Sequence, residues 1–527
     1  MPRAWSEGVQ AHALYVLGVA AMALSLPMDR FNGAGEALTR IFLLLGVLAV
    51  WRYSWGALHF LRAIVYRAFV FPRMRARADR AARAVAESGS APHAYLLVTS
   101  FRISGDTSAA VYRAAFRAAL NAPGRATVVA SIVELSDQRL VSGLHRLVCG
   151  DDSNVDLIIV RIAGTGKRDA LAFGFRAIAR REPAPDDVVA VIDGDSLVPP
   201  DLVIRCAGFF RSDQRVGALT TDERGQVLAG PLFQHWYALR FAQRHVLMSS
   251  MGLARRVLTL TGRMAMFRAG LVCNPSFIRQ IEFDWVDHWR FGRFRFLTGD
   301  DKSSWFWLLS HGHHMIYVPD VVVTTIEEPP SPGFLDSTAR LMTRWFGNML
   351  RTNARALALG PRRIGPFTWW SILDQRLSMW TSLAGLVMVM LVGLFMAPIA
   401  FLYYFVWILA SRYVMTMMLL GARPRVSIFY PPLLYFNQIF GAYIKIFILF
   451  RLHRQTWTRQ NTKLADGFGR ARLLLVNFSS TALHCLAIFS FVSLSAFAVG
   501  LLHPPTYWPM FYESSLLVNL CNGSCLP

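Results

Sequence analysis

Two aspartates separated by one glycine are the first residues of this chain that could do chemistry together. Asp193-Gly194-Asp195 directly follows an apolar run at residues 187–192. On an extended segment, residues two apart share a face, so both carboxylates can reach one hard cation. Mg²⁺ or Mn²⁺ held by one or two carboxylates completes its shell with water and substrate phosphate. A solvated Asp-Gly-Asp turn is the alternative, and the position at a strand end favours the metal site.

A second acidic pair, Asp300-Asp301, lies between the polar turn Thr298-Gly299 and an apolar run at residues 305–309. Adjacent carboxylates repel each other, which raises one pKa and lets that group accept a proton near neutral pH. Asp at the start of a helix is also favourable on its own account. The pair therefore indicates either a general base or a helix N-terminus.

Two basic motifs could bind phosphate groups. Lys167-Arg168 follows an expected strand at the start of an expected helix, where a nucleotide can be contacted. Arg344-Trp345 combines a cation that can clamp a diphosphate with a flat ring for a sugar or a base. The alternatives are a solvated surface for the first motif and a basic helix on a membrane surface for the second.

The elements that must position these motifs alternate between strands and helices. Apolar, β-branched runs predict strands at four places, and helical periodicity predicts a helix at residues 108–120; the strands are expected at residues 94–100, 126–133, 156–161 and 187–192. This alternation is typical of βαβ units and a mainly parallel sheet. Ligands of such sheets bind at the carboxyl ends of the strands, where the motifs lie. We expect this α/β domain at residues 73–360.

Composition excludes an ordinary soluble protein. Of the 527 residues, 54% are hydrophobic and 17% are charged, and the net charge is +22. The apolar stretches at residues 12–27 and 41–61 predict a membrane hairpin within residues 1–72. Arginines crowd after its second helix, as the positive-inside rule predicts for a cytoplasmic flank, so the charge does not indicate nucleic-acid binding: Arg62, Arg67, Arg73, Arg75, Arg77, Arg80 and Arg83.

The C-terminal part is expected to return to the membrane. We predict interfacial helices at residues 361–380 and a membrane region at 381–527. No charge interrupts residues 377–411, which suffice for two spans, and 473–503 predicts a final span. The segment 428–450 has polar residues, two prolines and basic flanks, so a re-entrant or interfacial helix is expected, followed by a basic cytoplasmic loop at 451–472.

The order of these motifs, with Gly-Arg-Met-Ala-Met-Phe-Arg at residues 262–268 between the two acidic pairs, resembles the processive family 2 glycosyltransferases. That family includes cellulose, chitin, hyaluronan and alginate synthases. The stretches 298–305 and 341–352 look like the alginate synthase branch, whose catalytic subunit is a mannuronan synthase. The resemblance implies a Rossmann-like GT-A domain in the cytoplasm, between transmembrane helices of a bacterial inner membrane.

The resemblance also implies an activity. It is that of an inverting hexosyltransferase that polymerises mannuronate from GDP-mannuronate into β-1,4-linked polymannuronate and moves the polymer across the membrane. A related synthase that uses a UDP-sugar is one alternative. A transport or scaffold protein with an inactive transferase domain is another.

Residue roles follow by position. The resemblance makes Asp193 and Asp195 the ligands of the metal and the diphosphate, and Asp301 the base, with Asp300 as its neighbour. It implies nucleotide or diphosphate contacts by Lys167, Arg168, Arg344, Trp345, Trp457 and Arg459. It implies acceptor contacts by Gly262, Arg263, Met264 and Trp345.

Two motifs depart from the family pattern. Leu341 stands where the family has a Gln, so an acceptor contact from that side chain is lost. The usual acidic motif after the second strand is replaced by residues 133–137, and either Glu134 or Asp137 is expected to contact the base of the nucleotide.

The resemblance further implies partners. These are a PilZ-domain subunit that binds cyclic-di-GMP, and periplasmic export proteins. Separately, Cys521 and Cys525 lie close together in the tail, and a disulfide would form if that tail faces an oxidising compartment.

Overall fold

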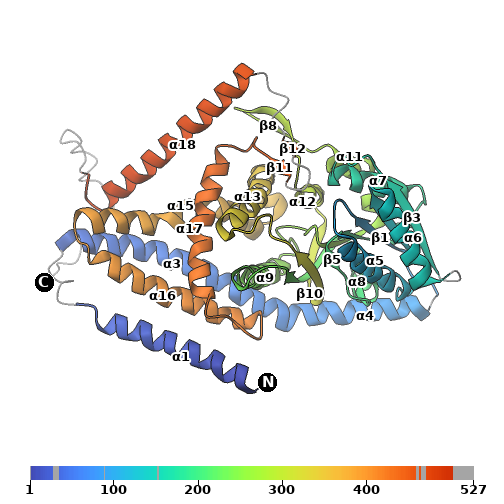
Figure 1. Cartoon of the computed structure of the whole chain (residues 1–527), viewed down its shortest axis with the longest axis horizontal. Helices are drawn as coiled ribbons and strands as arrows, with labels where there is room; N and C mark the ends of the chain where they lie inside the picture. The colour runs from blue at the N-terminus through green and yellow to red at the C-terminus, as the bar shows by residue number, and fades with distance from the viewer. Residues whose placement is uncertain are drawn as a thin grey trace.

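The computed structural model describes residues 2–27, 35–87, 89–150, 154–457, 462–463 and 470–502. One half is a mixed sheet covered by helices, and the other half consists of long apolar helices (Figure 1). Cys521, Cys525 and Arg459 lie outside the described residues, so the predictions made for them stay predictions.

The predicted parallel sheet is confirmed. Its first part has the order β3-β2-β1-β4, in which all neighbours are parallel: β1 Ala94–Thr99, β2 Ala126–Ile132, β3 Val155–Arg161 and β4 Val188–Asp193. The sheet continues with strands that the sequence analysis did not predict: β7 Met264–Arg268, β6 Val216–Val227, β10 His314–Glu327 and β5 Ser196–Leu197. β7 runs antiparallel to β4 and β6, and β5 runs antiparallel to β10.

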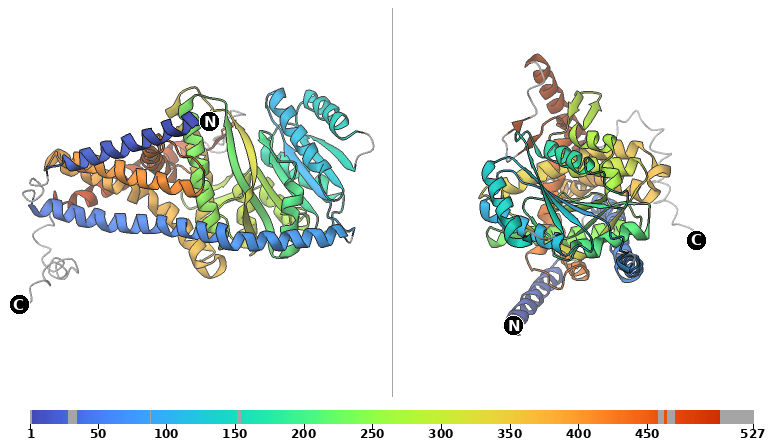
Figure 2. Two further views of the ribbon diagram at one scale, coloured as in Figure 1. Left: turned by 90° about the horizontal axis from the view of Figure 1, so that it is seen from below. Right: turned by 90° about the vertical axis from the view of Figure 1, so that its right-hand side faces the viewer.

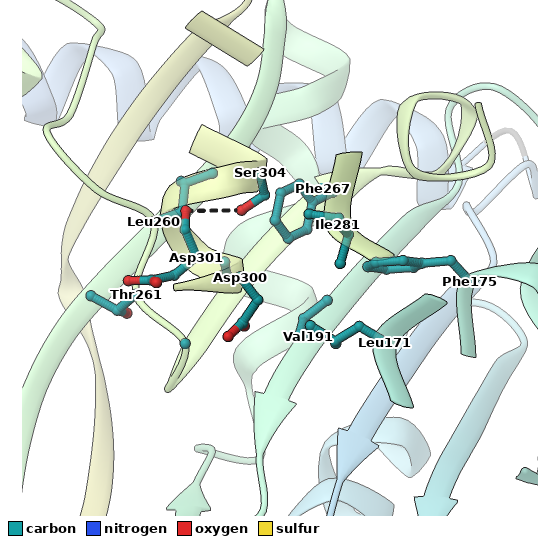
Figure 3. A pocket seen from close by; sticks show the side chains of 12 residues that line it. Leu171, Phe175, Val191, Leu260, Thr261, Phe267, Ile281, Asp300, Asp301 and Ser304 are labelled. Carbon is teal, nitrogen blue, oxygen red and sulfur yellow. Dashed lines mark hydrogen bonds between the residues drawn. The ribbon is translucent and has the colours of Figure 1, made fainter. Parts of the chain in front are cut away.

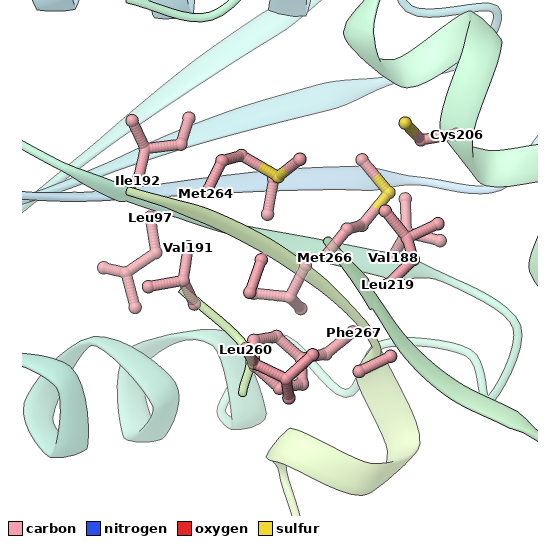
Figure 4. Close-up of a cluster of buried hydrophobic side chains, with 14 of the residues drawn as sticks. Leu97, Val188, Val191, Ile192, Cys206, Leu219, Leu260, Met264, Met266 and Phe267 are labelled. Carbon is pink, nitrogen blue, oxygen red and sulfur yellow. The ribbon is translucent and has the colours of Figure 1, made fainter. Parts of the chain in front are cut away.

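Helices cover the sheet because its strands are apolar on both faces. They are α5 Gly105–Leu120, α6 Leu135–Cys149, α7 Lys167–Ala179, α8 Leu202–Ser212, α9 Pro231–Gly252, α10 Ala269–Val272, α11 Pro275–Glu282 and α12 Asp300–Ser310. Figure 4 shows the core beside β4 and β7, where Leu97, Ile192 and Met266 are fully buried. A small hairpin, β8 Trp285–His288 and β9 Gly292–Arg295, lies outside this sheet.

Both expected N-terminal helices form, and both are longer than predicted. They are α1 Pro2–Leu24 and α3 Gly35–Val65. The π-helical turn η1 Tyr66–Val70 joins α3 to α4 Phe71–Glu87, and the three form one continuous rod that runs from the apolar helices along the half that holds the sheet (Figure 2). The Tyr66 hydroxyl donates to the carbonyl of Tyr317 at 2.5 Å, which ties this rod to β10.

The C-terminal part is helical: α13 Phe334–Ala358, α14 Pro361–Ile364, α15 Pro366–Phe395, α16 Ala400–Met418, the turn η2 Leu419–Gly421, α17 Tyr430–Leu449 and α18 Arg470–Ala498. A short hairpin, β11 Thr456–Trp457 and β12 Thr462–Lys463, precedes α18. Among the described residues, four helices are long and apolar enough to cross a membrane: residues 366–395, 400–421, 430–449 and 471–498. The protein is therefore associated with a membrane.

Two C-terminal helices can be compared with the sequence analysis. α15 continues without a break through residue 380, where we expected interfacial helices to give way to the membrane region, because no proline or glycine interrupts it there. α17 runs across the direction of α15 and α16 in Figure 1 and packs on α13. Its length and composition would permit a span, so the re-entrant or interfacial helix expected at 428–450 stays a prediction.

Candidate active site

The Asp-Gly-Asp motif lies at the carboxyl end of β4, as its position in the sequence predicted. The backbone N–H of Asp193 donates to the carbonyl of Arg263 at 3.2 Å, and the carbonyl of Asp195 accepts from Ile326 at 2.8 Å. A Cβ atom on Gly194 would lie 2.6 Å from the carbonyl oxygen of Thr99, so only glycine fits between the two acids. Neighbouring strands thus fix both ends of the motif.

Lys167 brings the two acidic pairs together. Its ammonium lies 2.5 Å from Asp193 Oδ1 and 3.1 Å from Asp300 Oδ2. Burial opposes the charge of Lys167, but the two carboxylates outweigh burial and raise its pKa. Burial raises the pKa of Asp193 to about 6 against the opposing charge of Lys167, with Asp195 and Asp300 adding to the rise. The lysine is therefore a fixed positive charge between the predicted donor site and the predicted base.

The second acidic pair begins α12, so the helix-start interpretation is correct. Gly299 precedes the helix with φ +86°, and Asp300 and Asp301 occupy its first turn, where the helix dipole favours negative charge. Burial and the charge of Asp300 raise the pKa of Asp301. Burial acts the same way on Asp300, but Lys167 and Arg168 outweigh it and lower the pKa of Asp300. Neighbouring carboxyls driven in opposite directions are the pattern expected of a general base beside an ionised partner.

Figure 3 shows a narrow pocket beside this pair. Asp300, Asp301, Thr261 and Gly262 form its polar side, and apolar side chains close the rest: Leu171, Phe175, Val191, Leu260, Ala265, Phe267 and Ile281. Asp301 points toward Thr261 in this view, while Asp300 points away from it. The hydroxyl of Thr259 donates to Asp301 Oδ2 at 3.3 Å. The pocket has a volume of about 20 Å³, room for a water molecule but not for a sugar.

Three residues hold the turn in front of Asp300. Arg168 is buried and donates to the carbonyls of Ile281 and Thr298 at 2.7 and 2.9 Å. The Thr298 hydroxyl donates to Asn348 Oδ1 at 2.8 Å, and Lys302 donates to the carbonyl of Leu258 at 2.6 Å. The nucleotide contact expected of Arg168 stays a prediction; the contacts described here hold the turn. Sequence reasoning missed both Asn348, which lies in the stretch 341–352 but was given no role, and Thr259, which lies in no recognised motif.

The 262–264 motif divides into three different environments. A Cβ on Gly262 would lie 2.9 Å from both Asp193 Oδ2 and Lys167 Nζ, so glycine leaves room at the acids. The Arg263 guanidinium pairs with Glu327 at 2.5 Å and Glu223 at 3.2 Å. Met264 is buried in the core of the sheet (Figure 4). The acceptor contact expected of Met264 stays a prediction, although β7 turns its side chain into the core.

Trp345 lies in an aromatic stack on α13. Its ring stacks on Trp236 with centroids 5.9 Å apart, and the Arg240 guanidinium lies 4.4 Å from its centroid. Arg344 lies near Glu327, whose pKa is lowered despite burial by Arg263 first and then by Arg344. Leu341, where the family has a Gln, is buried in the apolar cluster beneath this stack.

The candidates for contact with the nucleotide base remain open. Glu134 is exposed at the end of β2, directly before α6, and Asp137 lies in the first turn of that helix. Burial raises the pKa of Asp137, in part against a backbone hydrogen bond with Glu134. Trp457 belongs to the short strand β11. Both acids follow the carboxyl end of β2, on the same side of the sheet as the Asp-Gly-Asp motif at the end of β4. The arrangement therefore does not choose between them.

The donor set suits a metal ion that is completed by its substrate. Among the described residues, no group of three or more His, Cys, Asp or Glu side chains is arranged to hold a metal alone. Asp193 and Asp195 offer two carboxylates at one strand end, beside the space left by Gly262. Mg²⁺ and Mn²⁺ accept one or two carboxylates plus phosphate oxygens, so these residues fit a metal–diphosphate complex.

Comparison with known proteins gives the family. Residues 92–348 match the model of glycosyltransferase-like family 2. The chain is 45% identical to glycosyltransferase alg8 of Pseudomonas syringae pv. tomato over 84% of its own length and 88% of that protein. It is 43% identical to glycosyltransferase alg8 of Azotobacter vinelandii, over 91% and 95% of the two chains. The chain belongs to the Alg8 group of family 2 glycosyltransferases.

A solved structure is also similar. It is a mannosyltransferase of Pyrobaculum calidifontis in complex with GDP-Man and Mn²⁺, with 16% identity and a TM-score of 0.40 over 73% of this chain and 98% of that one. The family match confirms the glycosyltransferase activity, the alginate synthase resemblance and the GT-A fold with its mostly parallel sheet.

Proposed function

We propose that this Alg8-type glycosyltransferase polymerises mannuronate from GDP-mannuronate into β-1,4-linked polymannuronate and passes the polymer across the bacterial inner membrane. The observation that supports it most is Lys167, which joins the strand-end acids to the Asp300-Asp301 turn by contacts of 2.5 and 3.1 Å. The domain that carries the site is joined to the apolar helices in two ways. α3 continues through η1 into α4 beside the sheet, and α13 packs on α15 and α17.

Asp301 is proposed as the base. Its raised pKa suits a carboxylate that takes the proton from the 4-hydroxyl of the chain end. The freed oxygen attacks the anomeric carbon of the donor from the side opposite GDP, so the configuration inverts as the bond to the diphosphate breaks. Lys167 and Arg344 then balance the charge that develops on the departing GDP.

A metal bound by Asp193 and Asp195 would neutralise the diphosphate. Asp300, held ionised by Lys167 and Arg168, keeps the proton affinity of Asp301 high through its charge. Thr259 and Asn348 hold the base and its turn in position.

The membrane side of the proposal depends on charge and hydropathy. Arginines follow the first two helices and flank α17, which favours a cytoplasmic catalytic half. Regulation by a PilZ-domain subunit with cyclic-di-GMP, and delivery to periplasmic export proteins, complete the proposal by family resemblance.

The test is turnover with defined donors in purified membranes. GDP-mannuronate, UDP-glucose and UDP-N-acetylglucosamine are supplied separately, with and without cyclic-di-GMP and the partner subunit. Of the three donors, we expect only GDP-mannuronate to give a polymer. That polymer should be degraded by an enzyme that cleaves polymannuronate. Polymer from a UDP-sugar would instead support the related synthases. No turnover of any donor, with or without added metal ion, would support an inactive scaffold.

A further inference from the structure

Two cations lie among aromatic rings where α9, α13 and α17 meet, at the junction of the catalytic half with the apolar helices (Figure 1). Arg240 of α9 lies 5.1 Å from the ring centroid of Trp236 and 4.4 Å from that of Trp345. Lys445 of α17 lies 4.7 Å from the ring centroid of Phe346. These five residues are called the cationic–aromatic cluster below.

The cations of this cluster have no carboxylate partner within the described part of the chain. Neither Arg240 nor Lys445 forms an ion pair at 4.0 Å or less, and both side chains are half-buried. The acids whose charge reaches them are already paired: Glu327 with Arg263 at 2.5 Å, and Asp374 with Arg52 at 2.5 Å. Placing a cation in apolar surroundings without an anion costs free energy. The cluster is therefore complementary to an anionic ligand.

Helix α13 connects the cluster to the turn that holds the proposed base. Trp345 and Asn348 are three residues apart on α13, so they lie on the same side of that helix. Asn348 accepts the hydrogen bond of Thr298, in the turn that leads to Asp300 and Asp301. Trp345 therefore lies about one helical turn from Asn348, whose contact with Thr298 holds the turn before the proposed base.

We propose that Arg240 and Lys445 bind carboxylate groups of the acidic sugar units in the growing chain while the rings of Trp345 and Phe346 contact the sugars. Guanidinium and ammonium groups form charge-assisted hydrogen bonds with carboxylates, and aromatic rings offer flat apolar faces to sugars. A neutral polymer would leave both cations unpaired, so the cluster selects an acidic one. This assignment rests on the proposed function, because it supposes that the polymer is a uronate.

The experiment measures binding of sugar oligomers to the full-length chain in detergent, with no donor present. Mannuronate hexamers are compared with β-1,4-linked mannose hexamers, which differ only in the carboxylate. We expect the wild-type chain to prefer the acidic hexamer by at least about tenfold, the ratio that one net charge pair supplies. Arg240→Gln and Lys445→Gln each reduce that ratio, and the double variant abolishes it.

Matched variants separate charge from folding. Arg240→Lys and Lys445→Arg keep the charge and are expected to keep most of the preference. Arg340→Gln removes an exposed cation of α13 that pairs with Asp336 at 2.9 Å, and it is expected to change nothing. Equal preference for both hexamers in the wild-type chain, or a preference that survives the double variant, would overturn the proposal.

A lipid phosphate is the competing anion at such a junction. The same variants are therefore measured in nanodiscs of neutral and of anionic phospholipid. Loss of anionic-lipid retention with an unchanged hexamer preference would overturn the sugar assignment. Failure of the proposed function would look different, because GDP-mannuronate would then not turn over although the hexamer preference still depended on Arg240 and Lys445.

Discussion

At the scale of single residues, Asp300 and Asp301 are chain neighbours for which we propose opposite roles. Lys167 lies 3.1 Å from Asp300 and keeps it ionised, while burial and the charge of Asp300 raise the pKa of Asp301. Asp301→Asn keeps the shape of the side chain and removes the proposed proton acceptor. We expect polymer synthesis to fall at least about 1,000-fold, within the range of general-base catalysis. Incorporation of labelled sugar into polymer, at equal protein in the membrane, measures this.

The control for that substitution is Asp287→Asn on β8, where the side chain is exposed and 3.8 Å from Arg293. Full activity is expected there. Substantial polymer synthesis by Asp301→Asn would contradict the assignment of Asp301 as the base and would mean that another group accepts the proton.

The same electrostatics predict the pH dependence. A base accepts a proton, and a carboxylate holds a metal ion, only when ionised, so a raised pKa of either group shifts the acid limb of activity upward. Burial raises the pKa of Asp193 to about 6, and burial with Asp300 raises that of Asp301. We expect kcat/KM for the donor to fall as pH drops through about 6, well above the ordinary carboxyl range. A profile that stays flat down to pH ~4.5 would contradict both shifts.

Sequence reasoning found the acids and the lysine but not all that surrounds them. Asp-Gly-Asp, Asp300-Asp301 and Lys167 stand in short motifs with interpretable spacing, and the structure brings them together. Asn348, Thr259 and the pairing of Arg263 with Glu327 depend on side chains from distant strands and helices. Charge alone could not tell that Arg168 is buried and donates to the carbonyls of Ile281 and Thr298.

At the scale of elements, the turn into α12 sets the position of the proposed base. Gly299 has φ +86°, and a Cβ there would lie 2.8 Å from the side chain of Asn348. Gly299→Ala therefore meets both the cost of a left-handed residue, about 1–2 kcal/mol, and a collision that displaces Asp300 and Asp301. We expect a lower melting temperature in detergent and at least about tenfold less polymer.

The other end of the same helix supplies the control. Gly312 has φ +78°, but a Cβ there would meet nothing within 4 Å. Gly312→Ala is expected to lower the melting temperature comparably and leave synthesis intact. Equal loss of synthesis in both variants would show that stability, not the position of the turn, controls activity.

Element prediction worked where periodicity is local. The strands β1 to β4 and helix α5 form close to their expected limits because short apolar runs alternate with polar turns. β6, β7 and β10 were not foreseen: β7 carries a motif read only for its chemistry, and β6 ends in charged residues that pair with other strands and helices. The direction of α17 depends on its packing against α13, which its own sequence does not contain.

At the scale of the whole molecule, a buried ionic contact joins the catalytic half to the membrane half. Arg423, in the loop before α17, donates to both carboxylate oxygens of Asp222 on β6, at 2.7 and 3.0 Å. Tyr317 and His245 also contact Asp222 within 3.0 Å. Burial opposes ionisation of Asp222, but His245 and Arg423 outweigh it and hold its pKa well below the usual range. This carboxylate therefore fixes the loop to the sheet.

The contact predicts how the two halves depend on each other. Arg423→Gln leaves Asp222 ionised and buried with fewer donors, which should lower the free energy of unfolding by about 3 kcal/mol. Asp222→Asn in addition removes the stranded charge, so the double variant should be more stable than the sum of the single changes by at least about 1 kcal/mol. Arg425→Gln, an exposed change in the same loop, should be neutral. Unfolding midpoints in detergent, with protease cleavage at this loop as a second readout, measure the coupling; strictly additive losses would mean that Arg423 and Asp222 stabilise the junction independently.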